Sequence, residues 1–126
     1  MKILLKKFKK VKSTNDTALN LIKKQNLSPI IVASETQSRG KGTMGKRWIS
    51  RKGNLFISIL FEMKSKKIDF KQYAILNAYV IKKVISKYIS KKASIKWPND
   101  ILIEKKKVCG ILQEVIHLKK KKFLVV

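Results

Sequence analysis

A glycine-rich basic segment lies between two stretches that read as β-strands, and this arrangement constrains the fold more than any other feature. From Arg39 to Trp48 it holds three glycines, four cations and one tryptophan. β-Branched and aromatic residues mark the flanking strands, at 30–35 and 55–61. Glycine permits close backbone approach, and backbone N–H groups beside cations bind anions. Composition alone leaves two interpretations open: a loop that wraps a small anionic ligand, or a basic hairpin loop on the surface.

The overall charge is a second conspicuous feature. The 126 residues carry a formal net charge of +24, which invites a nucleic-acid interpretation. However, Lys supplies all but three of the 31 cations, the exceptions being Arg39, Arg47 and Arg51. Specific base readout and bidentate phosphate binding favour Arg. The lysines are also spread in short runs along the chain, so the sequence favours a solvated lysine surface and no specific DNA binding.

Composition limits which other classes of protein this chain can belong to. A hydrophobic content of 44% predicts one folded domain with a core. Apolar runs are too short for a membrane span or a signal peptide, so we expect a cytoplasmic protein with no membrane partner. Cys109 is a single cysteine and the spacing of metal ligands is absent, so no metal site is predicted.

Two helices are predicted among the strands. Ser13 is a good N-cap for the first helix, which ends by Pro29; Ser13-Thr14-Asn15 at its start could either cap it or contact a polar ligand. The second helix spans 70–92, and its apolar stripe (Tyr73, Leu76, Val80, Val84, Ile85 and Tyr88) is expected to face the core. Further strands are expected at 3–8, 93–97, 101–104, 107–117 and 123–126, with a turn at 98–100. Because strict βαβ alternation is absent, the pattern favours an α+β fold with a mixed or antiparallel sheet.

Four separated motifs then combine. They are Ser13-Thr14-Asn15, the segment from Gln37 to Trp48, Lys96-Trp97-Pro98-Asn99-Asp100, and the segment from Lys107 to Glu114. In order and spacing they resemble the catalytic domain of biotin protein ligases, also called biotin–acetyl-CoA-carboxylase ligases. The resemblance covers nearly the whole chain. It implies a two-layer α+β fold of the class II aminoacyl-tRNA synthetase/biotin ligase type, with a mixed, largely antiparallel sheet packed against helices.

The resemblance implies a two-step, ATP-dependent ligase. Biotin and Mg-ATP would give biotinyl-5′-adenylate, and biotin would then pass to one lysine of the biotin carboxyl carrier protein of acetyl-CoA carboxylase. The first step brings a carboxylate against a phosphate, so cations and backbone donors must hold two anions together. The second needs a group that orients the lysine amine or takes its proton. Biotin, ATP and Mg²⁺ are thus the expected small molecules.

The resemblance also assigns residues. Biotin would be bound by Ser13, Thr14, Asn15, Gln37, Lys41, Gly42, Thr43 and Lys107, and the nucleotide by Arg39, Gly40, Lys41, Trp48 and Asn99. The catalytic group would be Lys96, Asn99, Asp100 and Lys107, with Asp100 handling the acceptor lysine. The glycine segment would close over the adenylate and shelter it from water.

Departures from the family pattern leave alternatives open. Many members carry Arg where this chain has Lys41 and Thr43, so retention of the adenylate is in question. Residues 1–126 are expected to form a single, incomplete catalytic domain, without the N-terminal helix-turn-helix domain or C-terminal β-domain of longer members. The alternatives are a truncated, inactive remnant that at most binds biotin, and a basic nucleic-acid-binding domain.

Overall fold

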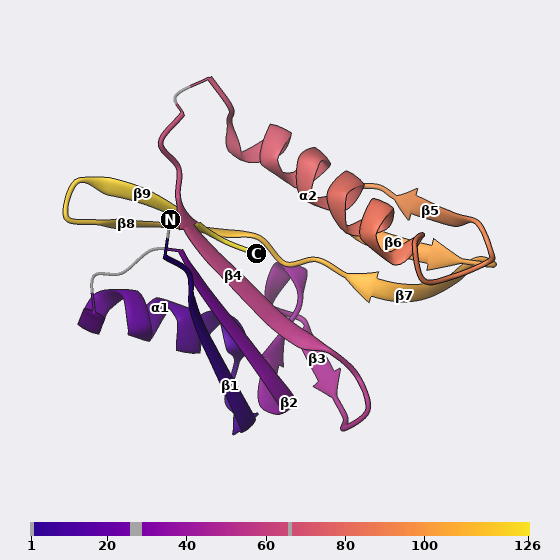
Figure 1. Ribbon diagram of the computed structural model, residues 1–126, viewed down its shortest axis with the longest axis horizontal. Helices are drawn as coiled ribbons and strands as arrows, with labels where there is room; N and C mark the ends of the chain where they lie inside the picture. The colour runs from indigo at the N-terminus through magenta and orange to yellow at the C-terminus, as the bar shows by residue number, and fades with distance from the viewer. Residues whose placement is uncertain (1, 26–28, 66) are drawn as a thin grey trace. The chain divides into compact units, whose positions relative to one another are not determined.

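The computed structural model describes residues 2–25, 29–65 and 67–126 (Figure 1). The chain forms two compact units. The first, here called the sheet unit, comprises Met1–Lys64 and Gln113–Val126. The second, the α2 unit, comprises Ser65–Leu112. Each unit is described by itself below.

The sheet unit is a mixed sheet with one helix. Its strands, among the described residues, are β1 (Leu4–Val11), β2 (Ile30–Lys41), β3 (Arg47–Ser50), β4 (Phe56–Glu62), β8 (Glu114–Leu118) and β9 (Lys121–Val125). They run in the order β1-β2-β4-β9-β8, and β3 pairs with β2 beside this path. Only β1 and β2 pair in parallel; α1 (Thr14–Gln25) connects them, and the other pairs are antiparallel. The predicted mixed, largely antiparallel sheet is confirmed.

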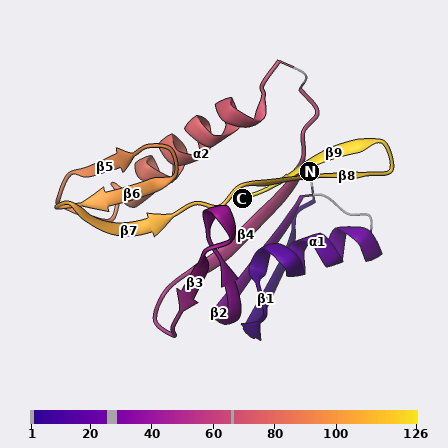
Figure 2. The same ribbon diagram turned by 180° about the vertical axis from the view of Figure 1, so that it is seen from behind.

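One face of this sheet packs on α1 to form the core (Figure 2). The helix contributes Ala18 and Ile22, which lie one turn apart on the same side. The strands contribute alternate residues, because successive side chains of a strand point to opposite faces: Ile30, Val32, Leu60, Phe123 and Val125. The last predicted strand therefore lies inside the sheet, between β4 and β8.

Leu60 is a core position where shortening the side chain should clearly lower the stability of the fold. It is fully buried, while its neighbour Ile59 is 40% exposed on the opposite side of β4. We expect Leu60→Ala to lower the free energy of unfolding by about 2–5 kcal/mol, because it leaves a cavity in the core. Ile59→Ala is the matched control and should cost less than half as much in the same urea titration. Equal losses would contradict the assignment of the core face.

The α2 unit is a helix on a small antiparallel sheet. Helix α2 (Phe70–Ile85) is N-capped by Asp69, whose carboxylate accepts from the Gln72 N–H, while the Gln72 side chain accepts from the Asp69 N–H. The strands β5 (Ala93–Lys96), β6 (Asp100–Ile103) and β7 (Lys106–Gly110) follow in sequence order. Two tight turns join them, at 97–99 and at Glu104-Lys105, where both residues have positive φ.

Two predictions about the second helix are wrong. It ends at Ile85 and not at residue 92, with Ser86 as its C-cap. The predicted core stripe is also wrong in most of its members, since Leu76, Val80 and Val84 are 45%, 46% and 49% exposed, while Tyr73 and Ile85 are half-buried. The fully buried residue of α2 is Ala78. This helix carries apolar residues around most of its circumference, so periodicity supports more than one stripe. Small residues allow the closest approach to β5 and β6.

Two strand boundaries also differ from expectation. The predicted strand at 107–117 is two strands, β7 and β8, which belong to different sheets and are separated by 111–113. Strand β2 continues to Lys41, well into the segment expected to be a loop. The turn predicted at 98–100 is present before β6. Among the described residues, no helix is long and apolar enough to cross a membrane.

Candidate functional site

The N-terminus of α1 is buried and polar. Ser13 Oγ accepts a hydrogen bond from the Asp16 N–H at 3.3 Å, so the predicted N-cap is present. Ser13, Thr14 and Asn15 are nevertheless all at least 94% buried, which capping does not require. Burying polar side chains is costly unless they are hydrogen-bonded. The predicted cap is therefore present, and the triplet is in addition a group of buried polar side chains.

Strand β4 supplies the partner of this triplet. Ser58, which is 1% exposed, lies within hydrogen-bond distance of Thr14 Oγ1 (2.7 Å) and of Asn15 Oδ1. The sequence analysis did not select Ser58, although a signal was available. It is the one polar residue in the otherwise apolar run from Leu55 to Phe61.

Gln37 of β2 joins the same group. Its Oε1 accepts from the backbone N–H of Thr14 at 2.8 Å and lies 3.1 Å from Thr14 Oγ1. Its Nε2 donates to Ser50 Oγ of β3 at 3.0 Å. The structure thus brings together four residues predicted from separate motifs, Ser13, Thr14, Asn15 and Gln37, at one end of α1.

Lys41 is held by two carboxylates. Its Nζ lies 2.6 Å from Asp16 Oδ1 on α1 and 3.7 Å from Glu114 Oε1 on β8. The hydrogen bond to Asp16 raises the pKa of Lys41 above its ordinary value, and the charge of Glu114 adds to this effect, outweighing partial burial. Glu114 also accepts from Asn15 Nδ2 at 2.7 Å. The sequence places neither Asp16, expected only to support the helix N-terminus, nor Glu114 among the site residues, since a contact across 99 positions is not visible in a sequence pattern.

The glycine segment is mostly a β-hairpin. Gly40 pairs with Trp48 and Lys41 with Arg47, so only 42–46 form the connecting turn, which contains the short 3₁₀ helix η1 (Thr43–Gly45). Gly40 is required by space: a Cβ there would lie 2.5 Å from the Trp48 carbonyl oxygen and 2.6 Å from Ser50 Oγ. Gly42 N–H donates to the Lys46 carbonyl at 2.7 Å and closes the turn.

The turn itself is open to solvent. Thr43, Met44 and Gly45 are all exposed, and Met44 is 96% exposed with φ of 57°. Arg39 is exposed as well, and its backbone N–H donates to the Lys12 carbonyl at 2.8 Å, just before α1. The hairpin is therefore anchored at its base, beside the buried polar group, while its tip is exposed to solvent.

The α2 unit holds the remaining predicted residues. Lys107 Nζ on β7 lies 2.8 Å from Asp100 Oδ1 at the start of β6, and the Asp100 side chain is 18% exposed. Asn99 Nδ2 donates to the Ile111 carbonyl at 3.1 Å, and the Ile111 N–H donates back to the Asn99 carbonyl at 2.8 Å. Lys96 pairs with Asp100 across the β5–β6 turn. Lys96, Asn99, Asp100 and Lys107 therefore gather at one end of this small sheet.

The environment of Cys109 reflects the same ion pair. Burial raises the pKa of the Cys109 thiol, and the nearby charge of Asp100 raises it further, while Lys107 acts in the opposite direction. The thiol is thus held in its neutral, weakly nucleophilic form, which agrees with a packing role.

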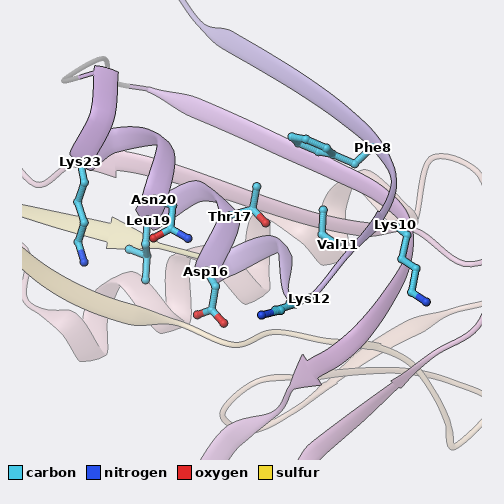
Figure 3. A pocket seen from close by; sticks show the side chains of 9 residues that line it. All are labelled: Phe8, Lys10, Val11, Lys12, Asp16, Thr17, Leu19, Asn20 and Lys23. Carbon is cyan, nitrogen blue, oxygen red and sulfur yellow. The ribbon is translucent and has the colours of Figure 1, made fainter.

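A surface hollow lies elsewhere in the sheet unit (Figure 3). It runs between β1 and α1, and its walls are Phe8, Lys10, Val11, Lys12, Asp16, Thr17, Leu19, Asn20 and Lys23. None of the predicted site residues lines it; Asp16 alone connects it to the group around Lys41. No group of three or more His, Cys, Asp or Glu residues that could hold a metal ion occurs in the part of the chain that the structure describes.

Comparisons with known proteins agree with this architecture. Residues 7–126 match the Biotin/lipoate A/B protein ligase family. The bifunctional ligase/repressor BirA of Bacillus subtilis is 33% identical over 104 residues, covering 82% of this chain and 32% of that protein. The biotin–acetyl-CoA-carboxylase ligase of Paracoccus denitrificans is 31% identical over 104 residues, covering 81% of this chain and 43% of that protein.

The fold is shared as well. The structure is similar to a biotin protein ligase from Aquifex aeolicus solved in complex with biotin and ATP, with a TM-score of 0.79 and 28% identity. That similarity covers 97% of this chain and 50% of that one. The chain belongs to the Biotin/lipoate A/B protein ligase family. It spans between about a third and a half of the length of these relatives.

Proposed function

We propose that this chain carries the biotin-activating centre of a biotin protein ligase. Biotin and ATP, brought with Mg²⁺ as the counter-ion of its phosphates, would give biotinyl-5′-adenylate and pyrophosphate. Biotin would then pass to a lysine of the biotin carboxyl carrier protein of acetyl-CoA carboxylase. The observation that carries this proposal is the group of buried Thr14 and Asn15 with half-buried Gln37, close to Lys41, in a chain of this family.

The first half of the site suits the ureido ring of biotin. That ring offers two N–H donors and one carbonyl acceptor in a rigid plane. Ser13, Thr14, Asn15 and Gln37 present hydroxyls and amides that are already fixed by hydrogen bonds, so little side-chain entropy is lost on binding. Gly42 and Thr43 of the hairpin turn would continue this surface toward the valeryl chain and the phosphates.

Adenylate formation joins two anions. A carboxylate oxygen of biotin attacks the α-phosphorus of ATP, and the bond from that phosphorus to the bridging oxygen of pyrophosphate breaks. Lys107 and Lys96 supply positive charge for this step, and Arg39 and Lys41 supply it from the hairpin. Trp48 would cover the adenine, with Gly40 allowing the close strand pairing at its side, and Asn99 would contact the nucleotide.

Transfer to the carrier needs a neutral lysine amine. The amine nitrogen attacks the acyl carbon, the bond to the phosphate oxygen breaks, AMP leaves, and one proton must be accepted. Asp100 is our candidate for this proton, since its carboxylate is largely buried and held in place by Lys107. We expect Asp100→Asn to slow transfer to the carrier more than it slows pyrophosphate release, because only the second step needs the carboxylate as a base. Equal slowing of both half-reactions would contradict this role.

One experiment separates the proposed enzyme from a remnant that only binds biotin. The 126-residue chain is incubated with biotin and α-labelled ATP, and biotinyl-5′-adenylate is resolved by chromatography. We expect adenylate that depends on biotin. Biotin binding by calorimetry without any adenylate would support the remnant, and salt-sensitive RNA or DNA binding without biotin binding would support the nucleic-acid alternative.

A further inference from the structure

A continuous chain of side-chain contacts links Glu114 on β8 to Thr14 at the start of α1. Glu114 Oε2 accepts from Asn15 Nδ2 at 2.7 Å. Asn15 Oδ1 contacts Ser58 Oγ, and Ser58 Oγ lies 2.7 Å from Thr14 Oγ1. All four residues belong to the sheet unit, and three of them are at least 94% buried. Water is therefore largely excluded from the chain, and its members must satisfy one another.

The chemistry of the two ends fixes the direction of every proton. A carboxylate only accepts, so Asn15 must turn its NH₂ group toward Glu114 and its oxygen toward Ser58. That oxygen also only accepts, so Ser58 must donate its single hydroxyl proton to Asn15. The 2.7 Å contact between Ser58 and Thr14 then needs the proton of Thr14, because two hydroxyl oxygens do not approach so closely without one.

Thr14 is left with lone pairs and no proton to give. The hydroxyl also lies 3.1 Å from Gln37 Oε1, which accepts from the Thr14 backbone N–H at 2.8 Å, so the proton stays within the protein whether it points to Ser58 or to Gln37. A ligand that contacts the Thr14 hydroxyl must therefore bring a donor. The ureido N–H groups of biotin have this polarity, and a carbonyl or ether oxygen at the same place does not.

We propose that Glu114 is a positioning residue for biotin: it orients the Asn15 amide and, through Ser58, makes the Thr14 hydroxyl an acceptor for a ureido N–H. This inference rests on the proposed function, since it names how the same site selects its ligand. Glu114 is also 3.7 Å from Lys41 Nζ, so a cation lies beside its carboxylate.

A double-mutant cycle tests the donor–acceptor direction of this series of hydrogen bonds. Asn15→Asp alone sets two carboxylates against each other, and we expect the Kd for biotin to rise at least ~10-fold, as for an unmade buried hydrogen bond. Glu114→Gln alone allows the Asn15 amide to turn either way, and we expect a rise of ~3- to 10-fold. In the double variant the Gln NH₂ donates to the new Asp, which still accepts from Ser58, so the Kd should return to within ~3-fold of the wild type.

Kinetics and stability distinguish positioning from a structural role. Glu114→Gln should raise the KM for biotin while the KM for ATP and the melting temperature stay near wild type, whereas Asn15→Asp should also lower the melting temperature because it buries two facing carboxylates. Glu35→Gln is the matched control. Glu35 lies on β2 in an exposed ion pair with Lys52, and its variant should change none of these values. Additive losses in the double variant, or equal changes in both KM values, would overturn the inference alone. A wild-type chain that binds no biotin would overturn the proposed function with it.

Discussion

Replacing Lys107 by alanine is expected to reduce the biotin-dependent rate of pyrophosphate release by roughly 10²- to 10³-fold, the usual effect of removing one charge-stabilising group. Two effects act in the same direction. The variant loses a cation that offsets the approach of carboxylate and phosphate. It also leaves the Asp100 carboxylate, 2.8 Å away in the wild type, without this partner in a largely buried position. The measurement is a coupled assay of pyrophosphate at saturating ATP.

Lys106→Ala supplies the control for this prediction. Lys106 is adjacent on β7 and exposed, and it belongs to no predicted site. Its variant should keep the wild-type rate and the wild-type melting temperature. A rate for Lys107→Ala within threefold of the control would contradict the role proposed for this side chain.

Replacing Gly40 by valine is the second change with a large expected effect. The new Cβ would meet the Trp48 carbonyl oxygen at 2.5 Å and Ser50 Oγ at 2.6 Å, so β2 and β3 could not keep their pairing. Ser50 is also the partner of Gln37, so the clash reaches the proposed biotin site. We expect a loss of about 1–3 kcal/mol in the free energy of unfolding and a biotin affinity reduced by at least ~10-fold.

Gly45→Ala separates this steric effect from backbone strain. Gly45 has φ of +72°, but no atom lies within 4 Å of the position of a Cβ there. Its variant should cost only about 1 kcal/mol through strain and should leave biotin affinity near the wild-type value. If Gly45→Ala weakens biotin binding as much as Gly40→Val does, the base of the hairpin is not the sensitive part.

Local signals in the sequence predicted several parts of this fold correctly. Ser13 can be predicted as the N-cap because the capping hydroxyl and the helical pattern that follows it are both local in the sequence. The turn after Trp97 and the strands around it follow from residue types alone. The extent of the glycine hairpin was not predictable in the same way. Gly40 and Lys41 look like loop residues, yet β3 pairs with them, and pairing is a tertiary property.

The errors share one physical cause, which is that burial depends on partners distant in sequence. On α2, Leu76 and Val80 are more hydrophobic than Ala78, yet Ala78 is the buried residue. In the candidate site, the resemblance to biotin ligases supplied Thr14, Asn15, Gln37 and Lys41. Ser58 and Glu114 emerged only when β4 and β8 were placed beside the start of α1.

The central claim, that this chain forms an adenylate from biotin, is tested most directly by isotope exchange. The full 126-residue chain is incubated with ATP and labelled pyrophosphate, and label appearing in ATP is counted with and without biotin. The account predicts exchange that requires biotin, saturates with it, and falls to background in Lys107→Ala. A folded chain that shows no exchange at saturating biotin, or equal exchange without biotin, would contradict the account.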